Sequence, residues 1–223
     1  MITKRFKKGW YNMAKTESVT LAPIKVKTAQ IFIEGTSDLV LNKMNARNTR
    51  VLTADDRKKI REVPNRWEDI ITAINWRDPL PCKDTYTDCD EAMLFDLLKN
   101  NAPCISAFGL KKSFGQAVVR NEIDKYATKF DNAVNVLGNK GLIPVTFTEY
   151  AIDDRLMSPK RGAPINVSLS HFIGWKANFT IAYTDHVYSI EQIVNIINLA
   201  GFGLGIGSGR SSGYGRYEVV DFK

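Results

Sequence analysis

A glycine-rich stretch near the C-terminus places the strongest constraint on how this chain can fold. Seven of the 15 glycines lie between Gly201 and Gly215, in the run GFGLGIGSGRSSGYG. The run directly follows a helix-like segment, SIEQIVNIINLAG, and directly precedes a strand-like tail, RYEVVDF. Because glycine lacks a side chain, such a backbone can turn sharply and can approach a bulky ligand closely. Arg210 and Arg216 place cationic groups beside it, which suits an anionic ligand such as a phosphate chain.

The order of the flanking elements excludes the common nucleotide-cofactor loops. A dinucleotide fingerprint needs a strand followed by a helix, so that the pyrophosphate meets the helix N-terminus. Here a helix is followed by a strand, and no Gly-Lys-Ser/Thr ending of a Walker loop is present. We therefore predict no cofactor. A plain connection to the last strand remains the alternative, although most such connections take only ~2–6 residues.

Hydrophobic periodicity predicts the rest of the fold. Residues 26–35 and 175–185 alternate apolar and polar side chains, as strands do, and residues 141–152 are read as a further strand. Residues 67–75, 90–101 and 123–137 carry apolar side chains on one helical face. Ser189 and Gln192 form a capping-box pattern at the start of a helix that is expected to end at Gly201.

The predicted order is strand, helices, strand, strand, helix, strand. This order is that of an α+β, ferredoxin-like fold (split βαβ, RRM-like), with an antiparallel sheet, a helical insertion in the first crossover and a C-terminal glycine-rich loop. Residues 1–22 are expected to form a basic flexible arm and residues 23–223 a single domain, in which 44–140 is a mostly helical insertion.

Composition favours a polyanionic partner. Lys and Arg outnumber Asp and Glu by 31 to 24, which gives a net charge of +7. The three cysteines, Cys82, Cys89 and Cys104, match neither zinc-ligand spacing nor a disulfide framework, so no metal is predicted. No apolar run approaches the ~18 residues of a membrane span, and the basic N-terminus lacks an apolar signal segment. A cytoplasmic location without membrane contact is the expectation.

Three blocks of the sequence resemble a known family. The tail GIGSGRSSGYGRYEV is similar to the glycine-rich loop of the RAMP superfamily, ferredoxin-like RNA-binding proteins that build CRISPR effector complexes. Residues 103–120, PCISAFGLKKSFGQAVVR, and residues 31–43, IFIEGTSDLVLNK, resemble the start of a helix and the first strand of backbone subunits in those complexes. Residues 31–43 and the tail also resemble small RAMP-like proteins of phage genomes.

The resemblance implies a non-catalytic protein that binds single-stranded nucleic acid, RNA rather than DNA. It also implies assembly as a homo-oligomer along the strand or as a subunit of a ribonucleoprotein. Nucleic-acid contacts are expected from the glycine-rich loop, from a helix start and from a basic connection after residue 152, and the predicted contact residues are Lys111, Lys112, Arg155, Lys160, Arg161, Gly205, Gly207, Ser208, Gly209, Arg210, Ser211, Ser212, Gly213, Tyr214 and Arg216.

Individual residues within this set have different expected roles. Ser106 is predicted to cap a helix on which Lys111 and Lys112 lie off the core face, so that either lysine is a candidate phosphate contact. Tyr214 lies between two glycines and is the predicted base-stacking residue. Trp175, in contrast, is expected in the core because of its place in the strand alternation. The segment 43–66 is expected to form a second basic surface.

Two other functions remain open. RNA-cleaving relatives in the superfamily tend to use a histidine, so His171 and His186 are weak candidates for a metal-independent endoribonuclease. A metal-dependent route would need an aspartate after the first strand, where Asp38 lies. The second possibility is a phage structural or protein-interaction protein that retains the fold. The two histidines flank an extended strand, so they are not expected to act as a pair.

Overall fold

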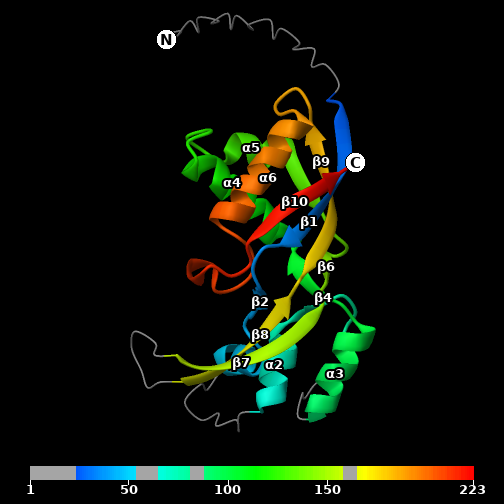
Figure 1. Cartoon of the computed structure of the whole chain (residues 1–223), viewed down its shortest axis with the longest axis vertical. Coiled ribbons are helices and arrows are strands. Elements are labelled where there is room, and N and C mark those ends of the chain that lie inside the picture. The colour runs from blue at the N-terminus through cyan, green and yellow to red at the C-terminus, as the bar shows by residue number, and fades with distance from the viewer. Residues whose placement is uncertain (1–23, 54–64, 81–87, 158–164) are drawn as a thin grey trace, which may run out of the picture.

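A computed structural model describes residues 24–53, 65–80, 88–157 and 165–223. The predicted basic arm, together with Lys160 and Arg161, lies outside the described residues. One end of the molecule consists of a sheet covered by helices, and the other carries a long hairpin beside shorter helices (Figure 1). The glycine-rich loop, coloured orange to red, lies where these two parts meet.

Four antiparallel strands form the predicted ferredoxin-like sheet. β1 (Val26–Gly35) pairs on one side with β10 (Tyr217–Phe222) and on the other with β9 (Lys176–Thr184), and β9 also pairs with β5 (Val134–Leu137). In chain order these are the first, fourth, third and second strands of a split βαβ fold, and their arrangement, β10-β1-β9-β5, is the order of that fold. The same sheet continues from β9 through β6 (Leu142–Thr146) and β4 (Pro103–Ser106) to β3 (Asn75–Trp76). The predicted fold class is confirmed.

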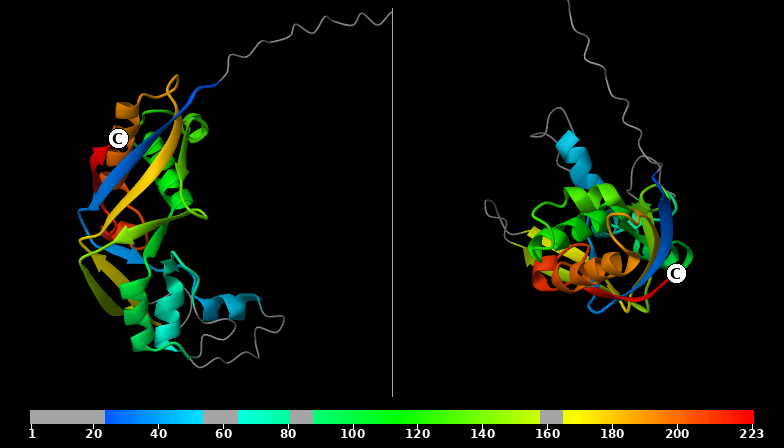
Figure 2. Two further views of the ribbon diagram at one scale, coloured as in Figure 1. Left: turned by 90° about the vertical axis from the view of Figure 1, so that its right-hand side faces the viewer. Right: turned by 90° about the horizontal axis from the view of Figure 1, so that it is seen from above.

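Two helices cover one face of this sheet (Figure 2). They are α4 (Ala107–Arg120) and α6 (Ile190–Gly203), which pack against each other. The rings of Phe114 and Phe179 stack between α4 and β9 with centroids 6.2 Å apart. Trp175 is fully buried, as predicted. The Ser106 cap and the Ser189 capping box are both present, so both helix starts are confirmed.

The end of α6 differs from the prediction. The helix continues two residues beyond Gly201, to Gly203. Gly201 is required for packing, because a Cβ atom there would lie 2.1 Å from the carbonyl oxygen of Tyr217. This glycine therefore lets α6 approach β10 closely and does not terminate the helix.

A second sheet replaces the predicted basic connection. β7 (Glu149–Met157) and β8 (Ile165–Ile173) form a hairpin, and β2 (Leu39–Leu41) pairs with β8. The sequence predicts a connection at 153–171, because this stretch is too long for a tight hairpin and is rich in turn residues. Polar residues of this stretch pair within the sheet, as Ser168 does by donating a hydrogen bond to Asp154 at 2.5 Å. The predicted strand 141–152 is in fact split between β6 (Leu142–Thr146) and β7.

The predicted helix at 123–137 is mostly wrong. Only α5 (Thr128–Ala133) is helical, and the next four residues form β5. Val134 is buried and is paired with Tyr183 of β9, so sheet pairing overrides the helical spacing of the apolar residues.

Most of the remaining elements lie at the end of the molecule that carries the hairpin. They are α1 (Ala46–Thr53), α2 (Arg66–Ala73), β3 (Asn75–Trp76), α3 (Glu91–Asn100) and β4 (Pro103–Ser106). β4 pairs with β6 and leads directly into α4, which fixes where that helix begins. Of the predicted basic surface at 43–66, Arg47, Arg50 and Arg66 form ion pairs with Asp69, Glu68 and Asp154, and residues 54–64 lie outside the described residues.

Candidate nucleic-acid interface

The glycine-rich loop is a tightly held structure. Its two halves are joined where the Ile206 N–H donates to the carbonyl of Gly215 at 2.9 Å. The loop is also fixed to the N-terminal part of the domain, since the N–H groups of Ser208 and Gly215 donate to the carbonyls of Val40 and Asp38, both at 2.8 Å. Residues from the two ends of the described domain therefore shape this loop together.

Two glycines in the loop are needed for this shape. Gly207 has φ +80° and would place a Cβ atom 2.5 Å from the carbonyl oxygen of Val40. Gly215 has φ +69° and would place one 1.8 Å from the carbonyl oxygen of Ile206. Both positions combine a left-handed backbone with direct contact to another strand of chain, which only glycine tolerates.

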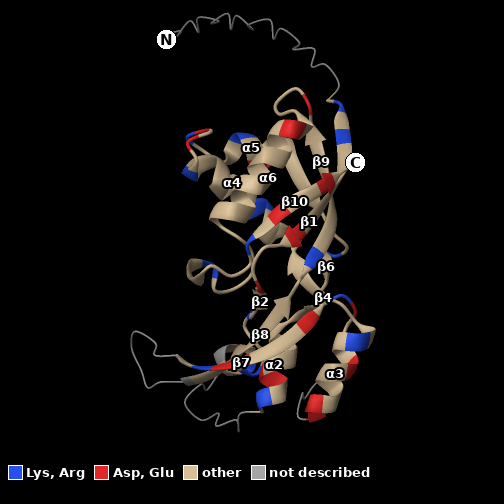
Figure 3. Ribbon diagram, viewed as in Figure 1, with Lys and Arg blue, Asp and Glu red and all other residues tan. Residues whose placement is uncertain are grey.

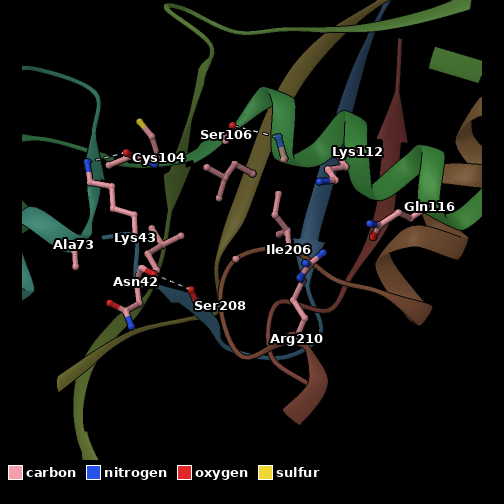
Figure 4. Close-up of a pocket in the computed structure, with 15 residues that line it drawn as sticks. Asn42, Lys43, Ala73, Cys104, Ser106, Lys112, Gln116, Ile206, Ser208 and Arg210 are labelled. Carbon is pink, nitrogen blue, oxygen red and sulfur yellow. Dashed lines mark hydrogen bonds between the residues drawn. The ribbon is translucent and has the colours of Figure 1, made fainter. Parts of the chain in front are cut away.

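A pocket of about 320 Å³ opens between this loop and the start of α4 (Figure 4). Lys112 and Gln116 lie on the α4 side, Arg210 lies on the loop, and Lys43 lies at the far end next to Asn75. The remaining lining residues come from the end of β2, from α2, from β4, from the start of α4 and from the loop, and they are Leu41, Asn42, Ala73, Cys104, Ile105, Ser106, Gly109, Ile206, Gly207 and Ser208.

A second hollow of about 590 Å³ continues the first along the same helix. The two share Gln116, Gly207, Ser208 and Arg210, so they form one continuous depression, which we call the basic groove. The second part adds Arg120, Gly203, Leu204, Gly209, Ser211 and Arg216. On α4, the positions 112, 116 and 120 follow one another every four residues, which places these side chains along one face of the helix.

The groove is lined by cations without counter-charges. Its lining includes five lysine or arginine side chains and no aspartate or glutamate; the cations are Lys43, Lys112, Arg120, Arg210 and Arg216. None of the five forms an ion pair with any carboxylate in the described part of the chain. Elsewhere, basic and acidic residues are interspersed (Figure 3), and pairs such as Lys27 with Asp185 and Lys176 with Glu34 are 2.7 and 2.6 Å apart.

Lys43 is the most constrained of these cations. Its ammonium group donates a hydrogen bond of 2.9 Å to the side-chain oxygen of Asn75. Although much of the residue is exposed, the ammonium lies against the pocket wall, and this loss of water lowers the pKa of Lys43. A phosphate in the pocket would offset the loss of water by supplying a negative charge.

Backbone groups add further donors to the groove. Within the described chain, the N–H groups of Gly207, Gly209, Arg210 and Ser211 have no hydrogen-bond acceptor. All four residues line the second part of the groove. Most other amides of the loop are used internally, so fewer of them face a ligand than the sequence suggested.

The predicted contact residues divide between the groove and other positions. The groove lining contains Lys112, Gly207, Ser208, Gly209, Arg210, Ser211 and Arg216. The lining does not contain Lys111, Arg155, Gly205, Ser212, Gly213 or Tyr214. Lys111 instead donates a hydrogen bond of 2.6 Å to Asn135 of β5, which directs it away from the loop.

Tyr214 and Arg155 join the glycine-rich loop to the hairpin. The Arg155 guanidinium donates a hydrogen bond of 2.6 Å to the Tyr214 hydroxyl and lies 5.5 Å from its ring centroid. The Tyr214 ring packs edge-on against His171, with centroids 5.0 Å apart. Arg155 also pairs with Asp153. Tyr214 therefore already has one partner at its hydroxyl and another against its ring.

The three weak catalytic candidates are separated into two places. His171 lies in β8, is only 6% exposed and has its Nδ1 atom 3.3 Å from the carboxylate of Asp38. Asp153 lies on its other side, 3.8 Å from Nε2. His186 follows β9 at the opposite end of that strand. Within the described residues, no group of three histidine, cysteine or acidic side chains is placed to hold a metal ion.

Sequence reasoning missed two parts of this site. Asn75 and Cys104 line the pocket together with Lys43 of the predicted basic segment 43–66, and no sequence pattern connects the three residues. Gln116 and Arg120 could have been found, because they continue the four-residue spacing that begins at Lys112.

Comparison with known proteins bears on the fold. No protein-family model matches the sequence, and no curated protein matches it. Among solved structures, a chain in the cryo-EM structure of the Type III-B Cmr-beta bound to cognate target RNA matches 89% of this chain with a TM-score of 0.50 and 14% identity. The chain has a RAMP-like fold. It spans 60% of the length of that Cmr-beta chain.

A second match is weaker. Cmr6 from Pyrococcus furiosus aligns over 88% of this chain and 100% of its own length, with 11% identity and a TM-score of 0.37, which is too low to indicate a shared fold. At such identities a RAMP-like fold is a statement about architecture alone. Separately, no helix among the described residues is long and apolar enough to span a bilayer.

Proposed function

We propose that this protein binds single-stranded nucleic acid in the basic groove, RNA in preference to DNA, and does not cleave it. The observation that carries the proposal is the lining of the groove: five cations, no carboxylate and no ion pair for any of the five among the described residues. Uncompensated cations along one groove are the electrostatic arrangement that a phosphate backbone requires. The preference for RNA is supported by the RAMP-like fold and by the matched structure, whose protein is bound to target RNA.

The groove also favours a polymer over a single phosphate group. Lys43 and Arg120 lie at different ends of it, with Lys112 and Arg210 between them. Side chains spread in this way match successive phosphates of a strand. These contacts address the backbone, so binding is expected to depend little on base sequence. The predicted contacts that lie outside the described residues, Lys160 and Arg161, remain part of the proposal.

The proposed assembly is either with further copies along the strand or within a ribonucleoprotein. The second arrangement is supported by the matched structure, which is that of Cmr-beta bound to cognate target RNA. Size-exclusion chromatography with light scattering, with and without a long RNA, separates the two: copies along the strand give a mass that rises with RNA length.

Neither alternative function gains support from the groove. His171 is buried against Tyr214 and is absent from the groove lining, so it is poorly placed to reach a strand bound there. Shortened RNA products that disappear in His171→Ala would overturn the non-catalytic proposal. Absence of nucleic-acid binding at low salt would instead favour the protein-interaction function.

The decisive experiment compares two adjacent lysines. Lys112 lines the groove, whereas Lys111 is bonded to Asn135 outside it. Binding of a labelled single-stranded RNA is measured by fluorescence anisotropy at several salt concentrations. We expect Lys112→Ala to weaken binding several-fold and to reduce the slope of log K against log salt by about 0.7, and Lys111→Ala to change neither. Equal effects of the two variants would show that the groove is not the binding site.

A further inference from the structure

The two most exposed aromatic side chains of the described residues lie next to the basic groove. Phe202 is 86% exposed and Phe108 is 74% exposed, more than any other large apolar residue except Leu156, which equals Phe108 at 74%. Each directly precedes a residue of the groove lining, Gly203 in the first case and Gly109 in the second. Neither ring takes part in an aromatic or cation–π contact in the described chain.

The positions of both rings follow from helix geometry. In α4 the residues Leu110, Phe114 and Ala117 face the core, and Phe108 lies off that face. Phe108 stands one turn before Lys112, so its ring lies on the exposed side of α4 that also borders the groove. Phe202 lies in the last turn of α6, opposite the buried stripe that includes Ile193, Ile197 and Ala200.

The two rings stand at different parts of the groove. Gly109, beside Phe108, lines the part that contains Lys43. Gly203, beside Phe202, lines the part that contains Arg120 and Arg216. A strand that follows the groove therefore passes one ring after the other.

We propose that Phe108 and Phe202 stack on bases of the strand whose phosphates occupy the basic groove. The inference rests on the proposed function and adds the residues that contact the bases. When the phosphates of a single strand face cations, its bases turn outward, and exposed aromatic rings are the usual partners for them. Tyr214, which the sequence favoured for this role, is instead held by Arg155 at its hydroxyl and by the ring of His171.

Stacking on phenylalanine recognises the face of a base, which all four bases share. Phe108 and Phe202 therefore add affinity without adding a strong sequence preference. They also require that the ligand carry bases, which distinguishes a nucleic acid from other polyanions such as polyphosphate.

The test uses the full-length protein and two probes: a labelled 12-nucleotide oligouridylate and an oligomer of equal length with abasic sugars. We expect Phe108→Ala and Phe202→Ala each to weaken oligouridylate binding by about tenfold and to leave binding of the abasic oligomer unchanged. Phe95→Ala is the matched control, because Phe95 is 57% exposed but lies on α3 away from the groove. Thermal unfolding of each variant checks that the fold is retained, as expected for exposed side chains.

The outcomes separate the two proposals. If the wild-type protein binds the oligouridylate and both phenylalanine variants bind it equally well, stacking is wrong and the proposed function stands. If the variants lose affinity for both probes to the same degree, the rings act on the backbone or on the fold, and stacking is again wrong. If the wild-type protein binds neither probe at low salt, the proposed function itself fails.

Discussion

At the scale of single residues, neighbouring glycines in this chain have different reasons for being glycine. Gly201 brings α6 against the backbone of Tyr217, and Gly215 holds the loop against Ile206. Gly203, only two residues from Gly201, has no atom within 4 Å of the position of a Cβ and does not have a positive φ. Its lack of a side chain is therefore not required by packing.

This difference predicts opposite effects of the same substitution. Gly201→Ala is expected to lower the free energy of unfolding by about 1–3 kcal/mol, because α6 must move away from β10. Gly203→Ala is expected to raise it by up to about 1 kcal/mol, because alanine restricts the unfolded chain and favours helix. Urea denaturation followed by circular dichroism measures both. A loss of stability in Gly203→Ala as large as that in Gly201→Ala would contradict the packing described here.

The residue scale also shows what the sequence could not reveal. The positions of Lys112, Arg210 and Arg216 beside a shaped glycine loop were predictable, because each lies in a segment whose local structure the sequence encodes. The different surroundings of Lys111 and Lys112 could not be predicted from the sequence. Lys111 is directed towards Asn135 only because α4 packs against β5. Tyr214 seemed free between two glycines, but its partners come from β7 and β8, which are distant in sequence.

At the scale of elements, the hairpin of β7 and β8 is coupled to the glycine-rich loop. The contact consists of the Arg155 hydrogen bond to the Tyr214 hydroxyl and the packing of Tyr214 on His171, with Asp38 beside the histidine. Residues 38, 155, 171 and 214, which lie far apart in the sequence, therefore meet at one cluster. The cluster lies outside the groove lining, and we assign it a structural role.

That assignment predicts the behaviour of Tyr214→Phe. Loss of the hydroxyl removes the hydrogen bond from Arg155, and the free energy of unfolding is expected to fall by about 1 kcal/mol. RNA affinity at fixed salt should change by less than twofold, because the ring still packs against His171 and the groove cations are untouched. Denaturation and anisotropy together give both quantities. A large loss of affinity with unchanged stability would return Tyr214 to the binding site.

Most of the wrong predictions concern where helices and strands begin and end. The ferredoxin-like order was predictable because β1, β9, α6 and β10 have clear periodicity and caps. Residues 134–137 were assigned to a helix because their apolar spacing fits one, yet pairing with β9 places them in a strand. The hairpin was missed because Asp154, Ser168 and His171 interrupt its alternation, and their partners become visible only after folding.

At the scale of the whole molecule, the groove sets the length of strand that one copy holds. Gly109 to Arg120 of α4 border it, a distance of about 17 Å at a rise of about 1.5 Å per residue. At the spacing of about 3.4 Å that nucleotides have in a stacked helix, this distance holds at most about five units. Affinity for oligouridylates of increasing length is therefore expected to rise steeply up to about five nucleotides and slowly afterwards. An increase that continues at the same slope up to about 12 nucleotides would indicate a longer path than this groove.

The hydrogen bonds that join the glycine-rich loop to residues 38 and 40 have a consequence for how the protein is made. The wall of the groove that carries Arg210 takes its shape from hydrogen bonds to Asp38 and Val40, which are synthesised about 170 residues earlier. During translation residues 38 and 40 are therefore made long before the loop segment that completes this wall. A nascent chain that stops short of residue 208 has no complete groove.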